Sequence, residues 1–394
     1  MKIFYVSALC SENVLDFLFK SSSVKPGSAP QKFNRLLVEG LSLCEIESAI
    51  ETLSEIPIPS RSNKKIFWNI PAENEGRIRY NYVPMINFRI LKSILIFVNS
   101  FFKLSYLILT SKKKNKIIIC DIINVPLSVT VFLASKLLKI RTIAIVTDLP
   151  SIDFAKKQKI YKRLSNLIIH KFDAYVLLTE QMNQQVNLRN KPFLIMEGLV
   201  DISMKDSKVI LKDRSLERII LYAGGLSELN GLNKLIDAFV LVKGENFRLH
   251  IYGAGEMEKD MQYYMNIDNR ILYFGSLPNK VIVERELEAT ILVNPRPTHE
   301  EFTKYSFPSK NMEYMVSGTP IITTALPGMP QDYYKYVYLF NDETVCGMAN
   351  TLRIVLSKSD VELYSQGKRA KEYVLDNKNN IVQAKRVLDL CSVL

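Results

Sequence analysis

A polar loop between residues 294 and 310 carries more charged and hydroxyl-bearing side chains than a connection between two elements needs. Arginine can hold a phosphate through two parallel hydrogen bonds, lysine offers a compact positive charge, and hydroxyl groups add neutral donors. Such a combination is typical of a site for a phosphate-bearing ligand. The side chains that we expect to bind or act on this ligand are Arg296, Tyr305, Ser306, Ser309 and Lys310.

Three glycine-containing turns earlier in the chain indicate the same kind of ligand. Each turn follows a short apolar run and precedes a predicted helix. Glycine allows the backbone to approach a ligand closely, and the start of a helix offers N–H groups to a phosphate. One such turn means little, but three turns at one edge of one sheet favour a phosphate-bearing ligand. The residues expected to contact it are Gly224, Gly225, Gly253, Gly275 and Leu277.

The polar loop is positioned by a strand on one side and a helix on the other. An apolar strand over 289–293 stops at Asn294, because the prolines that follow lack the N–H group that a ladder needs. A helix over 310–316 begins after Pro308 and ends at Gly318, and another strand follows it. Ligands of open α/β sheets bind beyond the carboxyl ends of the strands, which is where this loop is expected to lie.

Strands and helices alternate along the chain, which predicts an α/β fold with parallel sheets. In the first half, a helix between the strands 116–121 and 142–148 completes one βαβ unit. Asp148 ends the second strand, so its carboxylate can contact an acceptor hydroxyl group or, equally, cap the next helix. The polar segment 68–84 is expected to be exposed. Further predicted elements are the strands 3–10, 173–180 and 192–200 and a helix over about 31–42.

A charged stretch with little apolar content, residues 205–218, divides the chain. We interpret this stretch as an interdomain linker, because 394 residues are enough for two domains. The predicted domains are residues 1–205 and 206–394, and the C-terminal helix can cross back to the first domain.

Positive charge is concentrated in the first half. The net charge of the chain is +12. Residues 1–205 contain 29 Lys and Arg and 16 Asp and Glu, whereas residues 206–394 contain 23 Lys and Arg and 24 Asp and Glu. Between residues 86 and 119, seven basic residues and no acidic one are spread over an apolar run. Because three of them interrupt the run, a helix lying in the interface of an anionic membrane is favoured over a transmembrane helix. The alternative is a core helix followed by a solvated lysine turn. The sequence contains no nucleic-acid-binding motif, so no nucleic-acid partner is expected.

Cysteine and histidine usage argues against a metal site. The five cysteines form no CxxC pair, and the three histidines are scattered at positions 170, 250 and 299. We therefore expect no zinc site and no other cofactor. An odd number of unpaired cysteines is also typical of a reducing, cytosolic compartment.

The second half resembles nucleotide-sugar glycosyltransferases of the glycosyltransferase-B (GT-B) fold. The resemblance is carried by the order and spacing of LYAGGLSELNGLNKLIDAF, LHIYGAGEMEKDM, ILYFGSLP and YSFPSKNMEYMVSGTPII. It is strong over about 218–340 and weaker over 1–205. The greatest likeness is to family 4-like bacterial enzymes that build capsular or exopolysaccharide chains. The resemblance implies two Rossmann-like domains that face each other across a cleft, with acceptor bound by the first, nucleotide sugar by the second, and no metal.

The resemblance also implies roles for individual residues. Glu313 matches the second glutamate of the family's Glu–seven residues–Glu motif, which holds the ribose hydroxyl groups of the nucleotide. The first glutamate of that motif falls on Tyr305, and Glu300 or Glu301 is a candidate replacement. The family's basic pair, which stabilises the leaving diphosphate, falls on Gly225 and Asn230. We therefore expect two other cations, Arg296 and Lys310, to replace that pair.

These observations predict a glycosyltransferase that transfers a hexosyl group from a uridine-linked nucleotide sugar, with retention of configuration. The expected acceptor is a lipid-linked or growing polysaccharide in capsule synthesis, and the expected location is the cytoplasmic face of the cell membrane. Two alternatives remain open: a non-catalytic subunit that binds sugar nucleotides, and a nucleotide-sugar epimerase.

Overall fold

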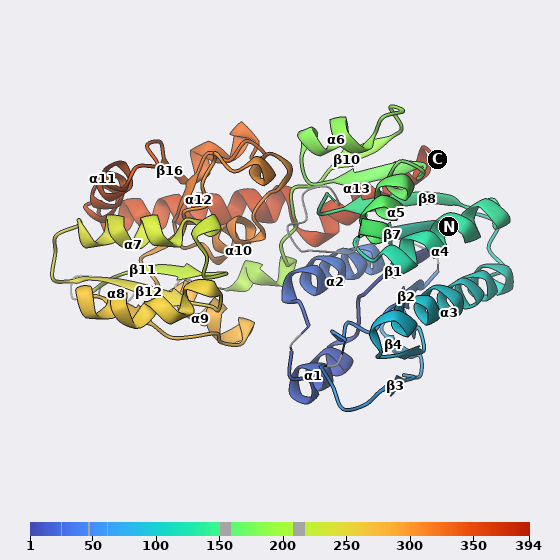
Figure 1. The fold of residues 1–394 in the computed structure, drawn as a ribbon. Coiled ribbons are helices and arrows are strands. Elements are labelled where there is room, and N and C mark those ends of the chain that lie inside the picture. Colours follow the sequence, from blue (N-terminus) through green and yellow to red (C-terminus); the bar gives the residue numbers. More distant parts are fainter. Residues whose placement is uncertain (25, 46–47, 61, 150–158, 208–216) are drawn as a thin grey trace. The chain divides into compact units, whose positions relative to one another are not determined.

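The computed structural model describes residues 1–24, 26–45, 48–60, 62–149, 159–207 and 217–394. These residues divide into two compact units (Figure 1). Unit 1 contains residues 1–199 and 380–394, and unit 2 contains residues 200–379. Most of the predicted linker, residues 208–216, lies outside the described residues.

Unit 1 is built on an eight-stranded sheet in the order β10-β9-β8-β7-β1-β2-β5-β4. All neighbouring strands are parallel except β4, which runs antiparallel to β5. The sheet strands are β1 (Lys2–Ser7), β2 (Ile50–Ser54), β4 (Glu73–Glu75), β5 (Ile78–Tyr82), β7 (Lys116–Asp121), β8 (Arg141–Val146), β9 (Ala174–Leu177) and β10 (Phe193–Ile195). A separate two-stranded ribbon joins β3 (Phe67–Trp68) to β6 (Met85–Ile86).

The helices of unit 1 cover its sheet, and α13, near the C-terminus, belongs to this unit. Gly40 of α2 lies against α13 so closely that a Cβ atom there would be 2.1 Å from the Asn380 carbonyl oxygen. The helices are α1 (Glu12–Ser21), α2 (Ser28–Leu43), α3 (Arg89–Thr110), α4 (Val125–Leu138), α5 (Lys159–Ile169), α6 (Glu180–Val186) and α13 (Asn380–Ser392).

The prediction that residues 68–84 are exposed is wrong for residues 80–83, which are buried, whereas most of residues 69–77 are exposed. The segment contains β4 and β5, and β5 pairs in parallel with β2 along its whole length. Tyr80 and Tyr82 point to the same face of the sheet, and both side chains are buried. Aromatic residues two positions apart fit a half-buried strand. The polar residues before them outweighed this signal in the sequence.

Unit 2 is a six-stranded parallel sheet in the order β13-β12-β11-β14-β15-β16. The first strand of the unit, β11, therefore lies inside the sheet. The next strands in the chain, β12 and β13, are added on one side of β11, and the chain then switches to the other side with β14. The strands are β11 (Arg218–Ala223), β12 (Phe247–Tyr252), β13 (Ile271–Tyr273), β14 (Ile291–Asn294), β15 (Ile321–Thr324) and β16 (Tyr338–Phe340). Alternating strands and helices with parallel pairing confirm the predicted α/β class.

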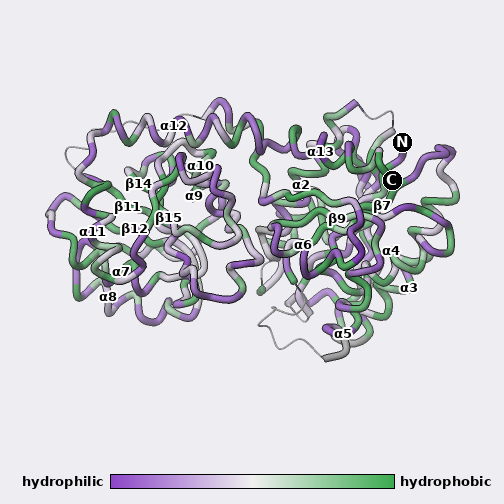
Figure 2. The backbone as a smooth tube through the Cα atoms, turned by 90° about the horizontal axis from the view of Figure 1, so that it is seen from above, coloured by the Kyte–Doolittle hydropathy of each residue, from purple (hydrophilic) through white to green (hydrophobic). Residues whose placement is uncertain are grey.

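The helices of unit 2 pack on both faces of its sheet, and two buried apolar clusters fill the space between the layers. In Figure 2 the central strands are hydrophobic segments, whereas α12 is largely hydrophilic. The helices are α7 (Leu232–Val240), α8 (Met261–Ile267), α9 (Asn279–Glu288), α10 (Ser309–Ser317), α11 (Val345–Leu356) and α12 (Asp360–Asn377). Short 3₁₀ turns include Glu228–Asn230 and Glu301–Tyr305.

The strand–loop–helix–strand unit predicted around residues 289–322 is present. The strand β14 ends at Asn294 before the two prolines, and α10 begins directly after Pro308. Gly318 ends α10 with a φ of 85°, a conformation that favours glycine. The prediction succeeded because proline and glycine limit the backbone conformation and hydrogen bonding of the residues next to them.

The helix α3 contains the single stretch among the described residues, Leu91–Thr110, that is long and apolar enough to cross a membrane. Only 22% of its most apolar window is buried inside the protein.

Candidate functional site

The candidate site lies where the strand order of unit 2 reverses. In open α/β sheets the crevice at such a switch point, beyond the carboxyl ends of the strands, is the usual ligand site. Here the turn Gly224-Gly225 leaves β11, and the segment Asn294–Pro297 leaves β14. Two stretches that the sequence singled out separately therefore meet at one point of the sheet.

A hydrogen bond joins these two segments. The Arg296 guanidinium donates from Nη2 to Asn230 Oδ1 at 3.3 Å, and Asn230 Nδ2 donates to the Gly225 carbonyl oxygen at 3.0 Å. Asn230 is one of the two positions where the resemblance placed a basic residue. Arg296, arriving from a different loop, thus lies beside the position where that charge was expected.

Two further contacts hold Arg296 in place. Its carbonyl oxygen accepts from Thr324 Oγ1 at 2.5 Å, and its guanidinium carbon lies 5.5 Å from the centre of the Phe302 ring. The Tyr222 hydroxyl nearby donates to the Gly225 carbonyl oxygen at 2.7 Å. Burial raises the pKa of Tyr222, and the positive charge of Arg296 acts in the opposite direction. A partly buried arginine held on two sides is suited to binding an anion in a fixed geometry.

The glycine turns pack backbone against backbone. A Cβ atom on Gly253 would lie 1.9 Å from the Gly224 carbonyl oxygen, so only glycine fits there. The N–H groups of Gly224 and Gly253 donate to the carbonyl oxygens of Tyr252 and Gly275. These two amides therefore hold the turns together. The Gly225 N–H makes no hydrogen bond among the described residues, which leaves it as the amide of this group suited to a ligand.

Two buried side chains anchor α10 to the same switch point. Asn311 Oδ1 accepts from Asn294 Nδ2 at 2.6 Å, which ties the helix to the end of β14. The Tyr314 hydroxyl accepts from the Ala223 N–H at 2.9 Å and lies 3.2 Å from the Ala223 carbonyl oxygen, at the end of β11. Lys310 is four residues before Tyr314 and therefore lies on the same helix face, one turn nearer the site.

Lys310 is held by carboxylates. Its Nζ atom lies 2.9 Å from Glu313 Oε2, and both side chains are largely buried. Burial lowers the pKa of Lys310, but the negative charges of Glu313 and Glu286 outweigh it, so the pKa lies above its ordinary value. Glu286 on α9 is only 2% exposed and was not predicted. Lys310 is therefore positively charged at neutral pH, and one oxygen of the Glu313 carboxylate is paired with it.

The remaining predicted residues of the loop differ in their surroundings. The Ser306 hydroxyl is buried without a hydrogen-bond partner among the described residues, and Ser309 is exposed at the start of α10. Tyr305 is half-buried in the 3₁₀ turn. The two candidate replacements for the missing glutamate are engaged: Glu301 pairs with Lys304 at 2.9 Å, and Glu300 lies 3.4 Å from His299.

An aromatic pair at the edge of the sheet was not predicted. Phe274 stacks on Tyr252 with ring centres 4.9 Å apart, and 44% of Phe274 remains exposed. The two rings stand directly before Gly253 and Gly275, and Leu277 is partly exposed after them. An exposed ring beside glycine turns can stack on a nucleobase. The available signal in the sequence was an aromatic residue directly before a glycine in two successive strand–turn segments, Tyr252-Gly253 and Phe274-Gly275.

Asp148 lies in unit 1, two residues beyond β8, and is exposed. The switch point of unit 1, between β1 and β7, holds a different acidic group. Asp121 accepts from Asn34 Nδ2 at 2.8 Å and from the Ile123 N–H at 3.1 Å, and the Tyr5 hydroxyl donates to Asn34 Oδ1. Burial raises the pKa of Asp121, and these hydrogen bonds act against the rise. The sequence predicts that a strand ends at this residue, but its pattern indicates no role for the carboxylate.

Among the described residues, no group of three or more His, Cys, Asp or Glu side chains is placed to hold a metal ion.

The part of the chain that carries this site is similar to a known family. Residues 217–358 match the model of the family "Glycosyl transferases group 1". No curated protein sequence matches the chain at a significant level.

Solved structures share the fold over the whole chain. Sucrose-phosphate synthase from Thermosynechococcus elongatus has a TM-score of 0.71 at 14% identity, covering 99% of this chain and 98% of that one. The lipopolysaccharide outer core galactosyltransferase WaaB has a TM-score of 0.65 at 16% sequence identity. HepE from Anabaena, in complex with UDP, has a TM-score of 0.66 at 12% sequence identity. Both cover 100% of each chain.

These findings establish the GT-B fold for this chain. A glycosyl transferases group 1 domain spans most of unit 2, and with the shared fold it supports a glycosyltransferase.

Proposed function

We propose that this protein transfers a hexosyl group from a nucleotide-diphosphate sugar, with a uridine-linked donor, to a lipid-linked or growing polysaccharide. The observation that carries this proposal is the position of Arg296, held by Asn230 at the β11–β14 switch point beside Gly225. The match of residues 217–358 to glycosyl transferases group 1 and the UDP bound to HepE support a nucleotide-sugar donor.

The chemistry requires a cation at this place. During transfer, the bond between the anomeric carbon and the diphosphate oxygen breaks, and negative charge develops on the leaving diphosphate. A bond forms from the acceptor oxygen to the anomeric carbon, and the acceptor hydroxyl loses its proton. Preorganised cations and N–H donors stabilise the leaving group without reorganisation. Arg296, Lys310 and the Gly225 N–H are the groups that supply this here, with Ser306 and Ser309 as neutral donors, and transfer proceeds with retention of configuration.

Glu313 is assigned to the ribose of the donor. A carboxylate accepts a hydrogen bond from each hydroxyl group of a diol, and Glu313 has two oxygens of which one is 2.9 Å from Lys310. Tyr305 takes the position of the family's first glutamate, beside the donor sugar. Asp148 is assigned to the acceptor hydroxyl group, and no metal or other cofactor takes part.

The proposed location is the cytoplasmic face of the cell membrane, where unit 1 docks as a peripheral protein. The reason is the outer face of α3, defined as its exposed apolar side chains at helical spacing. Each of these side chains is at least 37% exposed, and none of them is charged. The outer face of α3 consists of Leu91, Ile94, Val98, Phe102, Tyr106 and Leu109.

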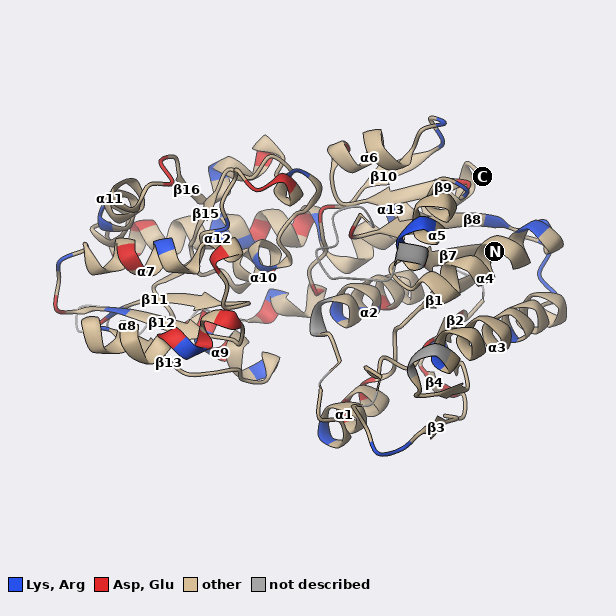
Figure 3. Ribbon diagram, in the orientation of Figure 1, with Lys and Arg blue, Asp and Glu red and all other residues tan. Residues whose placement is uncertain are grey.

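Lys92 and Lys103, two of the basic residues that interrupt the apolar run, turn away from the outer face of α3. Lys92 Nζ lies 2.8 Å from Glu55 Oε1, and Lys103 Nζ donates to the Tyr82 carbonyl oxygen at 2.8 Å. The apolar outer face is therefore continuous. Positive charge is instead gathered directly after the helix, at Lys112–Lys114 (Figure 3). An apolar stripe beside a basic cluster is suited to the interface of an anionic membrane.

A panel of sugar nucleotides tests the proposed activity. The full-length protein is first screened by thermal shift with nucleoside diphosphates and their sugars, because a ligand of the folded state raises the melting temperature. The best donor is then incubated with and without lipid-linked acceptors, and products are separated by mass. We expect transfer that needs an acceptor. Binding without transfer or donor hydrolysis would instead indicate a non-catalytic subunit, and conversion of the donor alone into its epimer would indicate an epimerase.

A further inference from the structure

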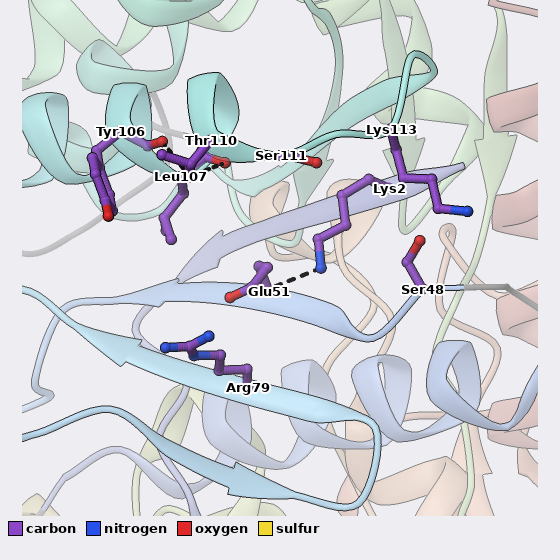
Figure 4. A pocket seen from close by; sticks show the side chains of 9 residues that line it. All are labelled: Lys2, Ser48, Glu51, Arg79, Tyr106, Leu107, Thr110, Ser111 and Lys113. Atoms are coloured by element: carbon purple, nitrogen blue, oxygen red, sulfur yellow. Dashed lines mark hydrogen bonds and ion pairs between the residues drawn. The ribbon is translucent and has the colours of Figure 1, made fainter.

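A pocket of about 320 Å³ lies in unit 1, where the end of α3 meets the amino-terminal ends of three parallel strands (Figure 4). Lys2 opens β1, and Glu51 and Arg79 are the second residues of β2 and β5. In α/β sheets the substrates bind at the opposite, carboxyl ends of the strands. This pocket is therefore separate from the switch points and needs its own explanation.

The pocket contains three cations and one carboxylate. Lys2 Nζ lies 3.2 Å from Glu51 Oε1, and Asn81 Nδ2 donates to Glu51 Oε2 at 2.9 Å, so the carboxylate is occupied on both oxygens. Among the described residues, Arg79 forms neither an ion pair nor a side-chain hydrogen bond. Lys113 adds a further positive charge from the segment after α3. The pocket consequently has an excess of positive charge and is suited to an anion.

A neutral group in the same pocket is also without a partner. Ser48 Oγ is buried and makes no hydrogen bond among the described residues. Buried hydroxyl groups without partners are uncommon, and an anionic oxygen would accept the hydrogen bond that is missing. Arginine can bind two oxygens of one phosphate. Arg79 and Ser48 therefore provide donors of the kind that a phosphate group requires.

Tyr106 connects this pocket to the outer face of α3. Its side chain lines the pocket, is 65% exposed, and also belongs to the apolar stripe along the helix (Figure 4). Tyrosine is enriched at the boundary between membrane and water, where one end of the ring is apolar and the other is hydrated. A molecule with a phosphate group in the pocket and hydrocarbon chains along α3 would contact both surfaces at once. A phospholipid has this chemistry.

We propose that the pocket binds the phosphate headgroup of an anionic phospholipid and thereby fixes the register in which α3 docks on the membrane. This inference rests on the peripheral membrane association within the proposed function and names the lipid class that the association requires. The headgroup meets Arg79, Lys113 and Ser48, while the outer face of α3 contacts the acyl chains.

Vesicle flotation of the full-length protein tests the inference. Vesicles of phosphatidylcholine alone are compared with vesicles that also contain phosphatidylglycerol, and we expect binding to the anionic ones. The double variant Arg79→Gln/Lys113→Gln should bind about tenfold more weakly than the control Arg77→Gln/Lys64→Gln. The control removes the same charge from exposed positions of unit 1 outside the pocket. Equal binding of the two double variants would overturn the headgroup site.

A water-soluble lipid separates this inference from the membrane proposal. Dihexanoylphosphatidylglycerol, used below its micelle concentration, should raise the melting temperature of the wild type and leave that of Arg79→Gln/Lys113→Gln unchanged. Stabilisation by inorganic phosphate but not by this lipid would refute a lipid headgroup. If vesicles fail to bind while the soluble lipid still stabilises the wild type, the docking face fails and the headgroup pocket stands.

Discussion

Arg296 illustrates how a side chain gains a role from its surroundings. The residue is fixed by rigid prolines on both sides, its carbonyl oxygen is bound by Thr324, and its guanidinium reaches Asn230 at 3.3 Å. The positive charge of Arg296, which follows β14, therefore lies beside the turn that follows β11. A cation that is already in place costs no reorganisation when the diphosphate leaves.

Replacing Arg296 should reduce turnover more than it raises the Michaelis constant. Removal of one transition-state donor costs on the order of 10²–10³ in rate at comparable oxyanion sites. We expect a loss of this size for Arg296→Ala and a smaller one for Arg296→Lys, which keeps the charge but loses the paired hydrogen bonds. Steady-state kinetics with saturating acceptor measure both. Arg353→Ala, at an exposed position on α11, is the control, and an unchanged kcat in Arg296→Ala would refute the assignment.

Glu313→Gln should weaken donor binding. A hydrogen bond to a charged group is worth about 1.5–3 kcal/mol, so the dissociation constant should rise roughly tenfold or more. The substitution also removes the carboxylate that helps to keep the pKa of Lys310 high. Glu372→Gln is the control, because Glu372 lies 3.8 Å from Lys368 on the exposed surface of α12, outside the candidate site. Calorimetric titration with the nucleoside diphosphate measures the dissociation constant of each variant. Equal affinities in both variants would contradict the ribose contact.

Asp121 should make stability fall as pH rises. Its pKa is raised mainly by burial, so between the ordinary value of 3.8 and the raised value the folded state binds more protons than the unfolded state. The free energy of unfolding then decreases with rising pH across that window, and Asp121→Asn removes this contribution. We expect the stability of Asp121→Asn relative to wild type to increase from pH 4 to pH 8 in urea titrations. The exposed Asp16→Asn serves as control, and a pH-independent difference for Asp121→Asn would show that its carboxylate ionises normally.

At the scale of elements, α10 is positioned by contacts from its side chains to two strands. Local residues set where α10 begins and ends. Its position on the sheet is set by hydrogen bonds from Asn311 to the end of β14 and from Tyr314 to the end of β11. Lys310 and Glu313 depend on this placement, because they occupy the same helix one turn or less from Tyr314. A change in the anchor should therefore be visible in both stability and donor binding.

Tyr314→Phe removes the hydroxyl group that accepts from the Ala223 N–H. Leaving a buried backbone donor without a partner costs about 1–3 kcal/mol. We expect the free energy of unfolding to fall by this amount and the Michaelis constant for the donor to rise. Chemical denaturation followed by fluorescence gives the first value and initial rates give the second. Tyr263→Phe, on the exposed side of α8, should change neither; a stable Tyr314→Phe with normal kinetics would mean that packing alone places α10.

At the scale of the whole molecule, charge and hydrophobicity are distributed between the two units. The basic excess belongs to residues 1–205, and the described part of unit 1 presents the outer face of α3 next to a lysine cluster. Unit 2 holds the candidate donor site. Under the proposed function, unit 2 therefore binds the nucleotide sugar and unit 1 contacts the membrane.

Membrane association should depend on the outer face of α3. Phe102→Ser/Leu109→Ser removes two side chains that are 67% and 68% exposed, so folding should be little affected. Because each fully buried side chain of this size contributes about 1.5–3 kcal/mol, vesicle binding should fall at least tenfold. Leu188→Ser/Val361→Ser changes equally exposed apolar residues elsewhere and is the control. Flotation at two salt concentrations measures the effect, and equal binding of both double variants would show that α3 does not touch the membrane.

The alternation of strands and helices, the bounds of α10 and the polar loop before it could all be predicted from the amino-acid sequence. These features could be read because hydrophobic periodicity, proline and glycine act over a few neighbouring residues. Segment 68–84 was misread, since the burial of Tyr80 and Tyr82 depends on pairing with β2, far away in the chain.

The directions of the long charged side chains could not be predicted from the sequence, because they depend on the assembled fold. Arg296 turns to Asn230, 66 residues earlier, and Lys92 turns inward to Glu55, which leaves the outer face of α3 apolar. A long side chain can reach several partners, and the partner that it meets depends on which distant strand ends lie beside it. That proximity arises only when the sheet is assembled, so no local pattern contains it.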